Sequence, residues 1–312
     1  MQYALKRILL GLPTLLAMFT AIFVIIRVVP GDAAAVILGD QASGAALDAL
    51  RLELGLDRPL SQQYLGFLGG LLHGDLGTSL MTKRPVLEEA LRVLPNTLEL
   101  AAASILVGLA LGLPFGIYAA IHRNAWPDYV GRLFSLIGLS LPAFVSGILL
   151  LLAFAIQLRW FPVIGTSANV GPWDRFLGVA LPALNLGIIM SAYVARVTRS
   201  SMLTTLGEDF VRTARAKGIG PTAVALRHVL ANSLLPIITV VGLYFGTLIG
   251  NAVLTEIVFN RPGLGRLILG ALNTRDYTLL QGLMIVFASF VVLANVLTDL
   301  AYAAVDPRIR NA

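Results

Sequence analysis

Few residues in this sequence could carry out catalysis or bind a metal. There are three histidines, His73, His122 and His228, and no cysteine. The histidines lie far apart and outside the long apolar stretches, so their spacing predicts no metal site. The sequence also lacks the Gly-x4-Gly-Lys-Ser/Thr phosphate loop, the His-Glu-x2-His zinc motif and the Gly-x-Ser-x-Gly nucleophile motif. We therefore expect no catalytic centre and no bound cofactor, ATP included, in this chain.

The polar segment 196–231 has a pattern suited to mechanical contact. Acidic residues begin the stretch Glu208–Lys217 and basic residues end it, as the helix dipole favours, so a short helix is expected there. Gly218 is a suitable C-terminal cap, and Pro221 can open a second helix that continues into the next apolar stretch. An ordinary basic connecting loop fits the same pattern.

Two apolar stretches carry glycines four residues apart. Such glycines form a groove on one helix face, where another backbone can approach closely. The groove could serve packing within this chain or contact with a partner subunit. The six positions are Gly108, Gly112 and Gly116, and then Gly242, Gly246 and Gly250.

Ionisable residues lie at the ends of the apolar stretches. Asp299 is expected about 10 Å deeper along a helix than Asp306, where it could pair with Arg196 or reach the interface without a special partner. Glu256 lies near the opposite end of its stretch. It could act in gating or occupy an interfacial position.

The architecture predicted from composition is an all-α integral membrane protein. The 312 residues are 57% hydrophobic and only 13% charged, against about 25% charged in soluble proteins. About 20 apolar residues cross the hydrocarbon core, and continuous apolar stretches favour helices over barrel strands. We expect an uncleaved first span rather than a secretory leader, because its apolar core is too long. About six spans are predicted, near residues 8–29, 98–121, 133–158, 176–197, 232–256 and 278–303.

Charge distribution predicts that both termini are cytoplasmic. The short loops then place 12 Lys and Arg residues in the cytoplasm and five outside. The long segment 31–96 is expected to form an external cap with short helices. The net charge of +6 is explained by this distribution across the membrane. The basic residues form no single stripe of the kind that binds nucleic acid.

The apolar stretches themselves contain no ionisable residue. A secondary transporter usually needs such groups near mid-membrane. A pathway driven by another subunit is therefore favoured over a secondary transporter or a channel-like protein.

Motifs throughout the chain resemble the permease subunits of the dipeptide, oligopeptide and nickel family of ATP-binding-cassette (ABC) importers. They occur in order and cover essentially the whole length. The motifs are Thr198–Leu203, Asp209–Gly218, Gly31–Asp32, Gly55–Leu60, Gly74–Ser79, Leu94–Leu100, Glu256–Phe259, Pro262–Gly265, Arg275–Tyr277, Asp299–Tyr302 and Asp306–Arg310.

Family permeases carry a cytoplasmic loop written Glu-Ala-Ala-x3-Gly-x9-Ile-x-Leu-Pro, which docks on the ATPase. Ala214, Gly218 and Leu230 match it outright, whereas Arg212 replaces the glutamate and Ala231 the last proline. The resemblance assigns ATPase coupling to the segment 196–231. The residues expected to take part are Glu208, Asp209, Phe210, Arg212, Ala214, Arg215, Lys217, Gly218 and Leu230.

The resemblance also implies a type I importer fold in the bacterial inner membrane. The implied partners are a second homologous permease, two ATP-binding ATPase subunits, an external substrate-binding protein and the lipid bilayer. Peptides, glutathione and nickel all remain open as substrates.

Overall fold

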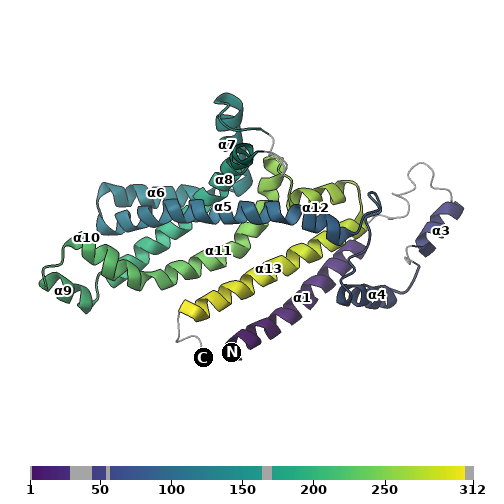
Figure 1. Ribbon diagram of the computed structural model, residues 1–312, viewed down its shortest axis with the longest axis horizontal. Coiled ribbons are helices and arrows are strands. Elements are labelled where there is room, and N and C mark those ends of the chain that lie inside the picture. The colour runs from purple at the N-terminus through teal and green to yellow at the C-terminus, as the bar shows by residue number, and fades with distance from the viewer. Residues whose placement is uncertain (1, 29–43, 54–56, 164–170, 306–312) are drawn as a thin grey trace. The chain divides into compact units, whose positions relative to one another are not determined.

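The protein is helical in the computed structural model, which describes residues 2–28, 44–53, 57–163 and 171–305 (Figure 1). Thr78 and Pro85 form an isolated β-bridge. The chain divides into two compact units, and α1, α5 and α13 contribute to both. Two family-like motifs, Gly31–Asp32 and Asp306–Arg310, lie outside the described residues, as does Gly55–Leu56.

Five helices among the described residues are long and apolar enough to cross a membrane, or six spans result if one bent pair counts as a single span. This agrees with the predicted fold class. The five are α1 (Gln2–Val28), α5 (Val86–Ile121), α8 (Pro172–Thr205), α11 (Leu230–Val258) and α13 (Tyr277–Val305). The bent pair is α6 (Trp126–Ser140) and α7 (Ala143–Leu150), which continues as the π-helix η2 (Leu151–Gln157).

The predicted continuous span over 133–158 is interrupted in the structure. The two helical parts meet at an angle of 104°. Leu141, between them, is extended (φ −87°, ψ 127°), the conformation that a following proline imposes. Pro142 therefore separates two helices rather than bending one.

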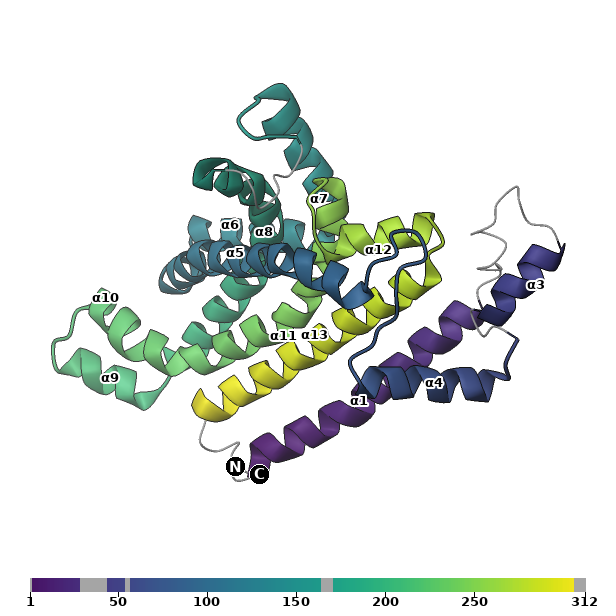
Figure 2. The same cartoon turned by 45° about the vertical axis from the view of Figure 1, so that its right-hand side comes forward.

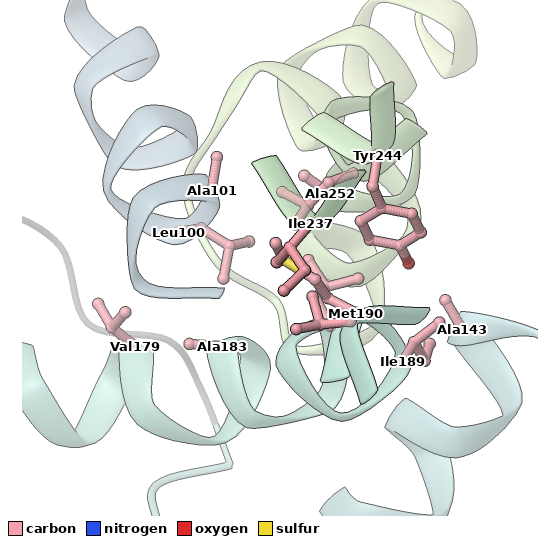
Figure 3. Packing of buried hydrophobic residues seen from close by; sticks show 13 residues of the cluster. Leu100, Ala101, Ala143, Val179, Ala183, Ile189, Met190, Ile237, Tyr244 and Ala252 are labelled. Carbon is pink, nitrogen blue, oxygen red and sulfur yellow. The ribbon is translucent and has the colours of Figure 1, made fainter. Parts of the chain in front are cut away.

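The first unit contains residues 96–262 together with both chain ends, 1–7 and 294–312. Its largest core lies between α5, α7, α8 and α11 (Figure 3). Leu100 of α5 and Met190 of α8 are fully buried there, beside Ile237 and Tyr244 of α11. Figure 1 shows α8 and α11 connected at one end by α9 (Asp209–Ala216) and α10 (Pro221–Ala223).

The second unit contains residues 8–95 and 263–293. Its core joins α1, the start of α5, α12 (Leu264–Asn273) and α13. The predicted external segment 31–96 contributes α3 (Gly44–Glu53) and α4 (Leu60–Leu72). α4 lies beside α1 (Figure 2), with the rings of Tyr64 and Phe23 5.2 Å apart. α5 begins at Val86, twelve residues before the predicted span, with Glu88 and Glu89 in its first turn, where the dipole favours acids.

Candidate functional site

The candidate site is the turn between α8 and α11, whose central element is α9. Glu208 is its N-cap residue, Asp209 lies in the first turn and Arg215 in the last, so the charges complement the helix dipole. The Arg212–Asp209 ion pair (3.5 Å) is almost fully exposed. Exposed pairs of this kind contribute little to stability, so packing must hold α9 in place.

Gly218 ends α9 in a left-handed conformation, with φ +79°. Its N–H donates to the carbonyl of Arg215 (2.9 Å), and the N–H of Ile219 donates to that of Ala214 (3.3 Å). These two bonds form a Schellman motif, the usual glycine-terminated helix end. The helix end is therefore fixed by backbone geometry as well as by packing.

The inner face of α9 is buried in an apolar cluster, which we call the anchor cluster. Val211 is 1% exposed and Ala214 8%. Their neighbours come from the C-terminal ends of α5 and α8 and from the π-helix between α10 and α11. Ile219 packs against them. The other buried members of the anchor cluster are Ala120, Met202, Val224, Ala225 and Val229.

The outer face of α9 is exposed and carries an aromatic ring among cations. Phe210 is 40% exposed, and Arg212, Arg215 and Lys217 are exposed around it. Aromatic and arginine side chains are enriched where proteins bind each other. This face can therefore receive a partner while the opposite face stays in the anchor cluster.

After the turn at Gly218, the chain enters a continuous span that begins at Pro221. Pro221 opens α10, the π-helix η3 (Val224–Val229) follows, and α11 continues to Val258. Leu230, at the start of α11, packs against both the anchor cluster and the core of Figure 3. A displacement of α9 would therefore reach the span directly.

The two glycine series meet different surroundings. A Cβ on Gly108, Gly112 or Gly116 would lie within 2.7 Å of α8 atoms, so α5 and α8 pack with close backbone approach. A Cβ on Gly246 would lie 3.0 Å from Oδ1 of Asn295, and one on Gly250 would meet nothing within 4 Å. The carbonyl of Gly242 accepts a long hydrogen bond from Thr298 (3.5 Å).

The flanking carboxylates have partners that the sequence did not predict. Asp299 pairs with Arg7 (3.2 Å), not with Arg196 as proposed from the sequence. Arg7 is close in space although it lies at the other end of the chain. Glu256 is fully buried within the protein and accepts a hydrogen bond from Thr97 (2.6 Å).

A cluster of ion pairs that was not predicted from the sequence joins the connection between α11 and α12 to α5. Arg261 is 1% exposed and donates to Glu99 (2.7 Å), which also binds Arg175 (2.7 Å). Burial lowers the pKa of the Arg261 guanidinium, and the Glu99 carboxylate opposes that shift. No sequence spacing could reveal this pair, because 162 positions separate its members.

A third cluster was detectable from sequence and was missed. Asp128 is fully buried and binds Arg132 (2.8 Å) and Arg199. The Asp128–Arg132 spacing is the i, i+4 spacing typical of helical ion pairs. Among the described residues, no group of three or more His, Cys, Asp or Glu side chains could hold a metal.

Comparisons with known proteins agree with this architecture. Residues 112–311 match the family model "Binding-protein-dependent transport system inner membrane component", and residues 1–101 match the corresponding N-terminal model. The chain therefore belongs to the family of binding-protein-dependent ABC importer permeases, and it is a transmembrane transport subunit of the inner membrane.

Among individual proteins, the chain is similar to glutathione transport system permease protein GsiC. It is 42% identical to the Pectobacterium atrosepticum protein and 39% identical to that of Escherichia coli strain K12, over 99% of each chain in both cases. It also resembles a chain of the structure entitled "Inward facing conformations of the MetNI methionine ABC transporter". That match has a TM-score of 0.57 at 17% identity and covers 70% of this chain and 96% of that one, so it supports the fold alone.

Proposed function

We propose that this chain forms half of a pathway for glutathione or another short peptide, and that α9 couples the pathway to an ATPase. The complete importer would contain a second homologous permease, two ATP-binding subunits and an external substrate-binding protein. In this proposal the chain binds no ATP and performs no catalytic step. Both of its termini lie in the cytoplasm.

The observation that carries the coupling proposal is the two-sided character of α9. Its inner face, Val211 and Ala214, is buried, whereas Phe210 and the neighbouring cations are exposed. An ATPase can drive a membrane pathway only through an element that contacts it and is rigidly joined to the spans. α9 offers an exposed face for such a contact, and its buried face packs in the anchor cluster with residues of α8 and η3.

Motion of α9 would be transmitted along two routes. Met202 of α8 and Val229 next to α11 are both fully buried in the anchor cluster, so α9 is packed against both helices. Close-packed interiors transmit displacement because they have little free volume. ATP-driven movement of the docked α9 would thus move α8 and α11 together, which suits alternating access.

The proposed substrate class is supported by the relatives. Proteins matching nearly the whole chain at about 40% identity are named for glutathione transport. Glutathione is a tripeptide, and the sequence motifs resemble permeases of peptide importers. A small peptide-like solute is therefore proposed, with selection among peptides assigned to the external binding protein.

The test is uptake by the complete complex reconstituted in liposomes with the external binding protein. We expect glutathione or short-peptide uptake only when ATP is present on the ATPase side and loaded binding protein on the other. A proton gradient without ATP should give no uptake. Uptake driven by the gradient alone would support the rival assignment as a secondary transporter and contradict the proposal.

A further inference from the structure

A cavity of about 430 Å³ lies between α5, α6 and α8, near the helix ends next to the α5–α6 turn. Three of its lining residues are arginines: Arg132, Arg196 and Arg199. The volume is within the usual range for small-molecule sites. None of the roles assigned above uses this cavity.

The accessible charge of the cavity is entirely positive. Among the described residues, its lining includes no Asp or Glu. The nearest carboxylate is Asp128, which is fully buried and accepts hydrogen bonds from Arg132, Arg199 and the backbone N–H of Asn124. One buried negative charge therefore faces three arginines, which leaves two positive charges in excess.

Arg196 differs from the other two arginines. It is exposed, and within the described part of the chain its side chain makes no ion pair or hydrogen bond. Arg132 and Arg199 are each held in a fixed orientation by Asp128. An arginine has five N–H donors, so donors remain free for an anion even on the two paired side chains. Ser135 and Ser200 add hydroxyl groups to the lining.

The cavity is also amphipathic along the helix axes. Phe115 lies four residues before Ala119 on α5, and Leu136 lies four residues after Arg132 on the opposite-running α6. Four residues of helix correspond to about 6 Å. Both apolar side chains are exposed (37% and 59%). Leu136 lies one turn beyond Arg132, and Phe115 lies level with Arg196, because the next residue, Gly116, closely approaches Ala195 of α8. An apolar chain could extend along them while a charged group stays at the arginines.

We infer that this cavity binds an anionic phospholipid, with the phosphate at the arginines and an acyl chain along Phe115 and Leu136. Arginine matches phosphate oxygens in charge and geometry. Basic pockets between transmembrane helices are suited to lipid headgroups. Bound there, the lipid neutralises the excess charge between α6 and α8.

The experiment measures phosphatidylglycerol and phosphatidylcholine retained by the purified complex, using native mass spectrometry and titration in detergent. Arg196→Gln is the test variant, because the side chain of this arginine has no partner among the described residues that the substitution would disturb. Arg123→Gln is the matched control, since Arg123 is also exposed and lies in the adjacent turn but outside the cavity lining.

We expect Arg196→Gln to bind phosphatidylglycerol about fivefold more weakly, the contribution of one cationic contact with an anionic lipid. Arg196→Lys should restore most of the binding, and neither variant should change phosphatidylcholine retention. Inorganic phosphate should displace phosphatidylglycerol no better than sodium chloride of equal ionic strength, because it lacks the acyl chain.

Equal phosphatidylglycerol binding by wild type, Arg196→Gln and Arg123→Gln would overturn the inference. Displacement by millimolar inorganic phosphate at constant ionic strength would identify a free-anion site instead and would also overturn it. An Arg196→Gln complex that binds the lipid normally but loses solute uptake would assign this arginine to the transport pathway.

Discussion

Replacing Gly218 with alanine should uncouple transport from ATP hydrolysis while leaving the protein in the membrane. Gly218 has φ +79°, and an added Cβ would meet no atom within 4 Å. The cost is therefore purely that of holding an L-residue in the left-handed region, about 1–2 kcal/mol. A penalty of this size changes the balance between the correctly terminated and the frayed α9 by roughly 5- to 30-fold.

Two matched variants separate this effect from a general loss of stability. Gly220→Ala should be nearly neutral, because Gly220 has φ −62° and a Cβ there also meets nothing within 4 Å. Gly218→Asn should fall between wild type and Gly218→Ala, since asparagine tolerates the left-handed region better than other residues with a Cβ.

The assay is uptake together with ATP hydrolysis stimulated by loaded binding protein, in liposomes containing equal amounts of complex. Gly218→Ala should lose most uptake and most stimulation, with unchanged membrane insertion, because α8 and α11 are not altered. Normal uptake by Gly218→Ala, with the ATPase subunits still bound, would refute the role given to the end of α9.

Three further outcomes follow from the structure. Gly116→Ala should lower the free energy of unfolding by about 1–3 kcal/mol and reduce the yield of folded protein, because its Cβ would lie 2.7 Å from the α8 backbone. Gly250→Ala should change neither, and the thermal stability of the purified protein measures both variants. Arg261→Gln should destabilise by about 2 kcal/mol, since it removes a buried partner of a carboxylate, and the midpoint of thermal aggregation should fall. Reporter fusions after Asn124 and Asn260 should report cytoplasmic and external positions respectively, and the reverse pattern would invert the proposed topology.

Local features of this fold were predictable from sequence. The helix near Glu208–Lys217 and its termination at Gly218 depend on neighbouring residues: terminal charges, a glycine and a following proline. The structure has this helix as Asp209–Ala216, with Gly218 left-handed. Such features form from short-range backbone and charge preferences, which a single sequence expresses directly.

Long-range pairing was not predictable. For Asp299 the sequence left two alternatives open, pairing with an arginine such as Arg196 or no special partner, yet it pairs with Arg7. Depth in the membrane restricts the candidates for such a pair, but the lateral order of helices decides between them. The sequence motifs that contain Ser79 and Asp276 also meet, through a 2.6 Å hydrogen bond, and nothing local to either motif indicates this.

The interruption of the third predicted span shows a different limit of prediction from sequence. Apolar composition continues through Leu141 and Pro142, so hydropathy alone predicts one helix. Proline in a membrane helix is compatible with either a bend or a break. The outcome depends on whether neighbouring helices satisfy the freed backbone groups, which is a property of packing.

The central claim, that α9 contacts the ATPase, can be tested by site-specific cross-linking, because the chain contains no native cysteine. Phe210→Cys would place a thiol on the exposed face of α9, and Val211→Cys would place one on the buried face next to it. With a short thiol-to-amine cross-linker, we expect an ATPase adduct from Phe210→Cys whose yield changes on ATP binding, and little adduct from Val211→Cys. No ATPase adduct from Phe210→Cys in a complex that still transports would contradict the claim.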